Sequence, residues 1–474
     1  MTALDDVLAA HGAAVRPLYQ VLDLLRTGSY ELADLVRLTG VPRRSVEDVL
    51  AALEADLEQS AAGVRITPHA RGAYESYALP ELPDPLDDAV AARPALRTML
   101  AERIAEVPAP LAALDHVQAT PETVLRRALW LNSRYDLRRS ELLFLGDHDL
   151  TSLAVRAVCP QARLTVVDLD ERVLSYLDET SEGDVRTVHT DLRVGLPPAV
   201  SGTADLVFSD PPYTPEGMGL FAARAVQALR EPTTGRILLA YGYSARHPAL
   251  GAQVQRALAT LGLTFEAILP DFHRYTGAQA IGSAADLYVC QPTAKAKKSG
   301  ARKGNSAIYT HGPQSVEAAG TKPALLSALR EIAAEGGLSL ETRPVGWATS
   351  GPEGDAVAMD LSADPGPWLL RTLLGTNARR LALLLPNNHP DLADAAAQAA
   401  LTALVSAKYR LRLLRSTPDN RHAVVVADVI DQPSDLLTRA HARLANALLD
   451  VPADLAGLRL VDVPRHRLAA LLPG

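Results

Sequence analysis

The chain is poor in cysteine and in aromatic residues. Its 474 residues include two cysteines, Cys159 and Cys290, and aromatic side chains make up 4% of the total. Two isolated cysteines provide neither the spacing of a metal site nor a disulfide framework. We therefore expect no metal cofactor and no disulfide-stapled fold.

Long apolar runs are also absent from the sequence. No apolar stretch is long enough to span a bilayer, and residues 1–6 lack the basic and apolar regions of a signal peptide. These absences predict a cytoplasmic protein with no membrane partner.

Positive charge is in the minority. The 55 acidic residues outnumber the 47 lysines and arginines, for a net charge of −8. A nucleic-acid partner needs a basic face, so we expect none. A cationic small molecule suits an acidic protein better. A chain of this length is expected to form about three domains.

Residues 1–80 predict a winged-helix-like module. The apolar residues have helical spacing over 17–26 and 30–38, and a turn is expected at 39–42. A second helix is expected from the cap Ser45 to about Leu57, followed by a short strand at 63–68. This order of elements is that of a winged helix. The second helix carries acidic side chains that would repel phosphates: Glu47, Asp48, Glu54, Asp56 and Glu58. A packing or dimerisation module is therefore favoured over a DNA-binding one, and a homodimer is possible.

Residues 81–135 begin as a proline-rich acidic linker and continue as helices, one of them over 121–131 with Thr120 as its N-cap. From 136 to 292 strands alternate with helices. The strands are expected at 141–145, 164–167, 185–188, 206–208, 236–240, 265–269 and 287–290, with helices at 151–158, 171–178, 215–229 and 249–261. This alternation predicts an α/β fold with a Rossmann-like, doubly wound sheet of the class I methyltransferase type.

A basic segment at 293–310 is interpreted as a flexible segment or linker. Residues 311–474 show a second α/β pattern, with strands expected at 356–361, 380–385 and 423–428 and a helix at 391–406. We find no catalytic motif in this C-terminal domain, and no repeat of the first sheet beyond the general βα pattern. Its role stays open at this point.

The loop after the fourth strand is the strongest functional signal. It consists of Asp210, Pro211, Pro212, Tyr213 and Thr214. The prolines end the strand because they cannot donate to the ladder, so the loop starts at the carboxyl edge of the sheet, where ligands bind. Such loops are typical of enzymes that hold an amine beside a sulfonium. A plain strand-to-helix connection is the less favoured interpretation.

Acidic residues follow the first three strands. Only Gly146 remains of a dinucleotide-binding glycine pattern, and Asp147, His148 and Asp149 come after it. Carboxylates at a strand end can bind ammonium groups, although Asp149 would equally serve as the cap of the next helix. Asp168 is placed to bind ribose hydroxyls, and Asp191 to receive an adenine amino group. Residues 241–244 and 271–275 are weaker candidates for the wall of the same pocket.

Together, the N-terminal module, the Gly-Asp-x-Asp loop and the Asp-Pro-Pro-Tyr-Thr loop resemble the branched-chain polyamine synthase family, also called N(4)-bis(aminopropyl)spermidine synthases, over about residues 1–310. The resemblance implies transfer of aminopropyl groups from decarboxylated S-adenosylmethionine to a polyamine such as spermidine, with release of methylthioadenosine and no metal. It implies catalytic roles for Asp147, Asp149, Asp210 and Tyr213. Cofactor contacts fall on Gly146, Asp168 and Asp191, and substrate contacts on His148, Pro211, Pro212 and Thr214. His148 replaces the middle acid of the family's Gly-Asp-Asp-Asp loop, which removes one negative charge.

Two alternatives stay open. One is a methyl- or aminocarboxypropyl-transferase that uses intact S-adenosylmethionine, which would require a cation for the carboxylate of that cofactor. The other is a winged-helix regulator that senses polyamines without catalysis. The acidic second helix of residues 45–57 argues against the regulator.

Overall fold

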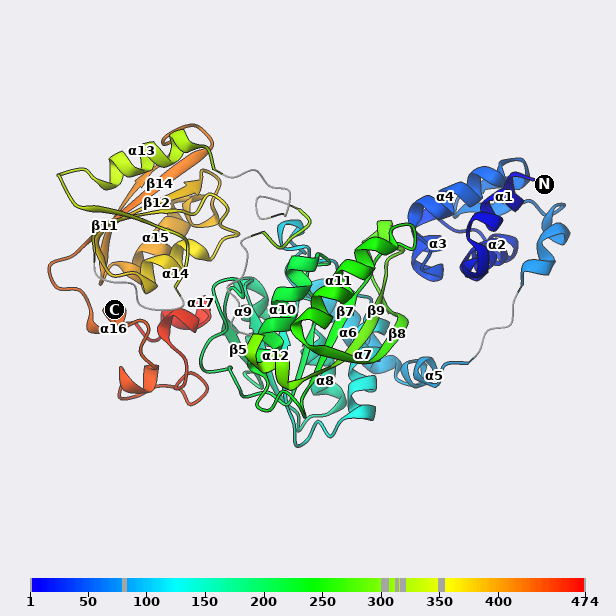
Figure 1. Cartoon of the computed structure of the whole chain (residues 1–474), viewed down its shortest axis with the longest axis horizontal. Helices are drawn as coiled ribbons and strands as arrows, with labels where there is room; N and C mark the ends of the chain where they lie inside the picture. The colour runs from blue at the N-terminus through cyan, green and yellow to red at the C-terminus, as the bar shows by residue number, and fades with distance from the viewer. Residues whose placement is uncertain are drawn as a thin grey trace.

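The computed structural model describes residues 2–78, 83–299, 307–311, 315, 321–347 and 354–472. An N-terminal module, a central α/β domain and a C-terminal α/β domain follow one another along the longest axis of the molecule (Figure 1). None of the helices in these described ranges combines the length and the apolar character that crossing a membrane requires.

The N-terminal module consists of helices and one hairpin. Its elements are α1 (Ala3–Ala10), η1 (Gly12–Ala14), α2 (Arg16–Thr27), α3 (Leu32–Thr39), α4 (Arg43–Ala52), η2 (Glu54–Asp56), β1 (Leu57–Ser60), β2 (Gly63–Ile66) and η3 (Arg71–Tyr77). The strands β1 and β2 pair antiparallel. Leu57 belongs to this hairpin, so the prediction of one helix up to Leu57 is wrong. Ser45 is not the cap of α4: it is buried inside that helix, where its hydroxyl accepts a hydrogen bond from Arg246 Nε at 2.9 Å.

Helices lead from this module to the sheet. They are α5 (Pro85–Ala91), α6 (Pro94–Glu106), η4 (Ala112–Leu114) and α7 (Pro121–Arg134). The predicted cap of α7 is confirmed, since the Thr120 hydroxyl accepts a hydrogen bond from the backbone N–H of Thr123. The linker expected from residue 81 lies partly outside the described residues.

The central sheet has seven strands in the order β5-β4-β3-β6-β7-β9-β8. They are β3 (Glu141–Leu145), β4 (Arg163–Asp168), β5 (Val185–His189), β6 (Leu206–Ser209), β7 (Arg236–Tyr241), β8 (Leu263–Arg274) and β9 (Ala284–Pro292). The first five are parallel, and β9 pairs antiparallel with both β7 and β8. All seven predicted strands are present, and the sheet is Rossmann-like.

Both faces of this sheet are covered, as successive residues of β3 show. Leu142 and Phe144 pack into a core with α7, α8 (Thr151–Val158) and α9 (Glu171–Thr180). Leu143 and Leu145 face the opposite core with α10 (Pro215–Ala228) and α11 (Pro248–Leu261). Side chains alternate along a strand, so a strand with helices on both sides must be apolar throughout. This requirement explains the uninterrupted apolar runs in the sequence.

The chain continues through η5 (Gln279–Ile281), which precedes β9, and α12 (Ala294–Ser299) into the C-terminal domain. Its elements are α13 (Pro323–Ala333), β10 (Leu340–Arg343), β11 (Gly354–Asp360), α14 (Trp368–Gly375), β12 (Ala378–Pro386), η6 (Pro390–Leu392), α15 (Ala395–Val405), β13 (Tyr409–Leu414), β14 (His422–Val429), α16 (Asp435–Thr438), η7 (Leu444–Asn446), η8 (Leu460–Asp462) and α17 (Arg465–Leu468). The three predicted strands are β11, β12 and β14. The helix expected at 391–406 is divided between η6 and α15, and residues 300–306 of the basic segment lie outside the described residues.

The C-terminal sheet repeats part of the central one. Its order, β10-β11-β12-β14-β13, and its strand directions match those of β3-β6-β7-β9-β8. The topology therefore shows a similar strand arrangement in the two domains, which the sequence pattern did not disclose.

The C-terminal domain packs beside β5, the edge strand of the central sheet, and α9. Apolar side chains of both domains form one continuous core. The Trp347 ring stacks on buried His189 at a centroid distance of 6.4 Å, and Arg371 forms an ion pair with Glu171, the first residue of α9. The C-terminal domain thus covers part of the edge strand β5.

Candidate active site

A cavity of about 520 Å³ opens at the carboxyl ends of β3, β4, β5 and β6. Ten of the eleven predicted site residues line it: Gly146, Asp147, His148, Asp149, Asp168, Asp191, Asp210, Pro211, Pro212 and Tyr213. Thr214 is not part of the wall. Its hydroxyl caps α10 and donates to the carbonyl oxygen of Ile308 at 2.7 Å, so it supports the wall from behind.

The loop after β3 makes a sharp left-handed turn. Gly146 has φ +75° and Leu150 has φ +62°. This turn points the carboxylate of Asp147 back to the start of α8, where it accepts a hydrogen bond from the backbone N–H of Ser152 at 3.1 Å. Asp149 is turned away from that helix, so the alternative that Asp149 caps it is wrong. Asp147 provides the side-chain acceptor at this helix start instead.

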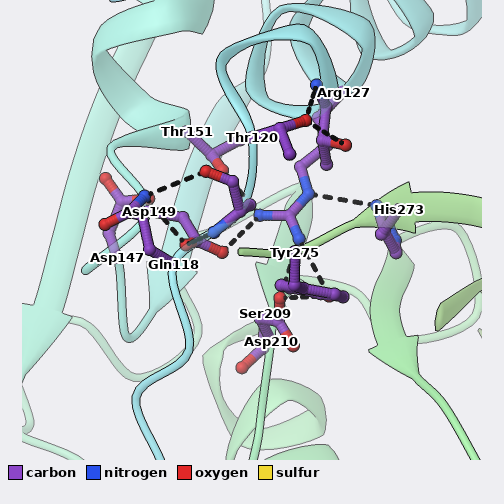
Figure 2. A network of polar contacts seen from close by, with 12 residues as sticks. Gln118, Thr120, Arg127, Asp147, Asp149, Thr151, Ser209, Asp210, His273 and Tyr275 are labelled. Carbon is purple, nitrogen blue, oxygen red and sulfur yellow. Dashed lines mark hydrogen bonds and ion pairs between the residues drawn. The ribbon is translucent and has the colours of Figure 1, made fainter. Parts of the chain in front are cut away.

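Arg127 of α7 lies between two of the predicted catalytic carboxylates. It is 1% exposed, and its guanidinium donates to Asp149 Oδ2 at 2.8 Å and to Asp210 Oδ2 at 2.7 Å. The remaining donors reach the side chains of Thr151, His273 and Tyr275 (Figure 2). A guanidinium has five N–H groups, so every donor of Arg127 has a partner inside the protein.

Tyr213 and Tyr275 complete the surroundings of Asp210. The Tyr213 hydroxyl donates to Asp210 Oδ1 at 3.0 Å, and the Tyr275 hydroxyl donates to Asp210 Oδ2 at 2.7 Å. Burial raises the pKa of Asp210, and the positive charge of Arg127 opposes that rise. Burial next to Asp210 also raises the pKa of both tyrosines well above the usual value, so both hydroxyls stay protonated as donors.

Asp147 and Asp168 have no cationic partner of this kind. Burial, strengthened by the neighbouring carboxylates of Asp149 and Asp168, raises the pKa of Asp147 to about 8. Burial and the nearby Asp170 raise the pKa of Asp168 to about 6. Asp170 is the N-cap of α9. Asp168 accepts hydrogen bonds from the backbone N–H groups of Asp147 and Asp170, which fix its orientation at the end of β4.

Asp191 is held by two other residues. Its carboxylate accepts hydrogen bonds from the backbone N–H, Nε and Nη2 of Arg193 and from Trp368 Nε1 of the C-terminal domain. Although burial alone would raise it, the charge of Arg193 holds the pKa of Asp191 below its usual value. A carboxylate has about four acceptor positions, so an adenine amino group would have to share one of them.

His148 takes part in a pair of imidazoles on the cavity wall. Its Nε2 lies 2.9 Å from the carbonyl oxygen of Pro108, and its ring contacts that of His116 at a centroid distance of 4.6 Å. Burial and the neighbouring His148 lower the pKa of His116 to about 4, so this ring is neutral near pH 7. The position of the family's middle acid therefore carries an imidazole next to the neutral ring of His116 in place of a carboxylate.

Sequence reasoning missed Arg127, and it gave Tyr275 only as a weak candidate. The signal for Arg127 was its place on α7, because it lies on the same face as the buried residues Val124, Ala128 and Leu131. A charge on the apolar face of a helix needs a buried partner of opposite charge. Such a position therefore indicates a polar site.

Comparison with known proteins supports the resemblance inferred from the motifs. Residues 96–306 match the sequence profile of the branched-chain polyamine synthase A C-terminal domain. An N(4)-bis(aminopropyl)spermidine synthase of Thermococcus kodakarensis is 31% identical over 175 residues, which are 35% of this chain and 49% of that protein. The enzyme of the same name from Methanocaldococcus jannaschii is 31% identical over 188 residues, 37% of this chain and 53% of that protein.

The similarity concerns one part of the chain. Residues 96–306 are similar to the branched-chain polyamine synthases. The chain spans about half the length of the curated relatives that it matches. A crystal structure of the Thermus thermophilus branched-chain polyamine synthase, in complex with N(4)-aminopropylspermidine and 5′-methylthioadenosine, is similar with a TM-score of 0.45 and 22% identity, over 67% of this chain and 98% of that one.

Proposed function

We propose that this protein transfers aminopropyl groups from decarboxylated S-adenosylmethionine to an amine of a polyamine and releases methylthioadenosine. The observation that carries the proposal is the charge of the cavity. Six aspartates line it, namely Asp115, Asp147, Asp149, Asp168, Asp191 and Asp210, and Arg127 is the one arginine or lysine among its described lining residues. Such a wall attracts ligands that carry several ammonium groups. The names of the curated relatives agree with this chemistry.

The same charges favour the decarboxylated donor over intact S-adenosylmethionine. An intact donor brings a carboxylate, which needs a cation or free N–H groups. All five donors of Arg127 are used by protein side chains. Among the described lining residues, a ligand carboxylate would therefore lie next to aspartates and find no arginine or lysine with a free donor. This argument disfavours the methyl- and aminocarboxypropyl-transferase alternative.

On the donor side, we assign Asp168 to the ribose hydroxyls, because it ends the second strand of a Rossmann-like sheet. Gly146 allows close approach of the donor: its φ is +75°, and a Cβ atom built there would meet no atom within 4 Å. Asp191 lies at the same edge and defines the adenine end of the cavity. The nucleoside would thus lie across the ends of β3, β4 and β5.

On the acceptor side, the Pro211 and Pro212 backbone and the fixed carboxylates of Asp149 and Asp210 orient the polyamine, and the Tyr213 ring covers it. The attacking amine must first lose a proton, because an alkylammonium has no lone pair. Asp147 accepts that proton in our proposal, since a carboxylate with a pKa of about 8 is a stronger base than an ordinary one. The new N–C bond then forms as the C–S bond breaks, and the electron pair stays on the sulfur of methylthioadenosine. Alignment of the two reactants supplies much of the acceleration.

We also propose that residues 2–78 form a winged-helix-like module that serves packing or homodimerisation. Support comes from the helices α2, α3 and α4, which are followed by an antiparallel hairpin. Arg43, at the start of α4, already bonds to Glu47 and to Gln279 of the central domain. This engagement favours packing over DNA contact.

Product analysis by mass spectrometry tests the proposed function. Purified protein is incubated with spermidine and either decarboxylated or intact S-adenosylmethionine, next to the variants Asp147→Asn and Asp210→Asn. Asp205→Asn is the control, because Asp205 lies just before the other end of β6 and pairs there with Arg230. Methylthioadenosine and products heavier by one or two aminopropyl units are expected for the wild type and the control, and both should be lost in the two test variants. Turnover with intact S-adenosylmethionine alone would refute the proposal.

A further inference from the structure

One contact joins the C-terminal domain to the wall of the cavity. Trp368, the first residue of α14, is 7% exposed, and its indole Nε1 donates to Asp191 Oδ2 at 2.8 Å. Asp191 itself lines the cavity at the end of β5. Trp368 lies outside residues 96–306, the region that the family profile matches. The contact therefore connects an added domain to a family site.

The position of Trp368 is fixed within its own domain. Asp364 is buried, and its carboxylate accepts hydrogen bonds from the backbone N–H groups of Gly366, Trp368 and Leu369. His389 Nε2 lies 3.0 Å from the same carboxylate. Contacts within the C-terminal domain thus fix the start of α14. They therefore also fix the position from which the indole contacts the central domain.

The indole of Trp368 also packs against the guanidinium of Arg193. The guanidinium of Arg193 lies 4.9 Å from the centre of the Trp368 ring and 5.3 Å from the centre of the Tyr309 ring. Tyr309 lines the cavity. Arg193 is therefore clamped between two aromatic faces while it binds Asp191, and cation–π contacts of this kind are stronger when they are desolvated.

We infer that Trp368 is a positioning residue for the donor end of the active site. The inference rests on the proposed function, because it assigns this end of the cavity to the nucleoside of the donor. The indole N–H fixes the rotamer of Asp191, and its ring fixes Arg193 and, through it, Tyr309. Trp368 acts only through these neighbours, since it is not itself a lining residue.

Docking of the domain does not depend on Trp368 alone. One turn further along α14, Arg371 is fully buried, forms an ion pair with Glu171, and donates to the carbonyl oxygens of Val461 and Val463. Trp347 adds the stacked contact with His189. Removing the indole N–H therefore leaves the interface assembled, and the effect on the donor can be measured separately.

The test compares Trp368→Phe with Trp347→Phe in the full chain. Phenylalanine at 368 keeps an aromatic ring next to Arg193 and removes the N–H donor together with the second ring of the indole. Trp347→Phe alters a buried ring of the same interface that contacts His189 instead of Asp191. We measure the dissociation constant of methylthioadenosine by calorimetry, the KM for decarboxylated S-adenosylmethionine and for spermidine, and the melting temperature of each variant.

For Trp368→Phe we expect the dissociation constant of methylthioadenosine and the KM for the donor to increase about tenfold. This increase corresponds to the loss of one hydrogen bond to a charged group. The KM for spermidine should change less than about twofold, and Trp347→Phe should match the wild type. Equal losses for both substrates, or equal losses in both variants, would reduce Trp368 to a structural role and overturn the inference. If Trp368→Phe does not fold, Arg193→Lys, which loses the fork geometry, must show the same selective loss.

Measurements on the wild type distinguish a failure of the positioning role of Trp368 from a failure of the proposed function. A wild type that binds methylthioadenosine while Trp368→Phe binds it equally well refutes the positioning role alone. A wild type that neither binds methylthioadenosine nor transfers an aminopropyl group refutes the proposed function, and the inference with it.

Discussion

Arg127 offers the sharpest test of the described site. The side chain is 1% exposed and forms ion pairs with Asp149 and Asp210. In Arg127→Met a similar volume remains without the charge, so two carboxylates are left buried and uncompensated. Removing one partner of a buried ion pair costs about 3–5 kcal/mol of unfolding free energy. For a domain of this size that loss corresponds to a fall in melting temperature of roughly 6–20 °C, measured by scanning calorimetry.

The neighbouring residue gives a matched control. Arg126 is on the same helix and also pairs with two aspartates, Asp84 and Asp87, whose side chains are 40% and 72% exposed. Exposed pairs contribute about 0–1 kcal/mol, so Arg126→Met should lower the melting temperature by no more than roughly 4 °C.

A triple variant separates the effect of charge from that of packing. Adding Asp149→Asn and Asp210→Asn to Arg127→Met removes the unpaired charges, and most of the lost stability should return. A loss in Arg127→Met no larger than that of Arg126→Met would show that Arg127 does not hold buried carboxylates. The argument that no cation is free for a donor carboxylate would then fail.

Three further predictions concern residues on the cavity wall. The value of kcat/KM should rise with pH and level off above about 8, as Asp147 ionises, and Asp147→Asn should lose activity and this pH dependence. Folding raises the pKa of Asp147 from 3.8 to about 8, so the folded state binds a proton that the unfolded state has lost. The free energy of unfolding of the wild type should therefore decrease as the pH rises through this range. In urea titrations at several pH values, the Asn variant should lack this decrease. Tyr275→Phe removes one donor to Asp210 and should lower kcat/KM by about tenfold to a hundredfold in a methylthioadenosine release assay; an unchanged value contradicts the role of this hydrogen bond. Gly146→Ala places a methyl group in the cavity on a left-handed residue, so the KM for the donor should increase while the KM for spermidine stays constant. A change in the KM for spermidine alone would contradict the placement of the donor next to Gly146.

Much of the central fold could be predicted because its signals are local. Each strand is an apolar run, and parallel strands place their carboxyl ends at one edge of the sheet. Asp147, Asp168, Asp191 and Asp210 follow four different strands, so the topology alone brings them to one cavity. The proline pair after β6 marked the edge itself.

The remaining features depend on contacts that the sequence does not encode locally. The expected ring of free carboxylates is partly neutralised, because Arg127 enters from a helix that precedes the whole sheet. Asp149 is of a residue type that commonly caps helices. Because Leu150 is left-handed, the carboxylate of Asp147 accepts the hydrogen bond from the first turn of α8 instead. Trp368 lies 177 residues from its partner Asp191, and no local pattern relates the two.

The similar strand order of the C-terminal domain has a consequence for how this protein can change. In the described residues 321–347 and 354–472, this domain has strands that correspond in order and direction to β3, β6, β7, β9 and β8, but none that corresponds to β4 and β5, the strands that lead to Asp168 and Asp191. Its strand β11 ends at Asp360, whose carboxylate accepts a hydrogen bond from the backbone N–H of Ser362, and Leu361 follows it.

A domain without counterparts of β4 and β5 lacks the strand ends that bring Asp168 and Asp191 to the cavity. It shares a hydrophobic core with the central domain and contacts Asp191 through the indole of Trp368. Under the proposed function, substitutions in this domain act on the reaction through the surface where the two domains meet. They can change the affinity for the donor while the reacting groups stay unchanged.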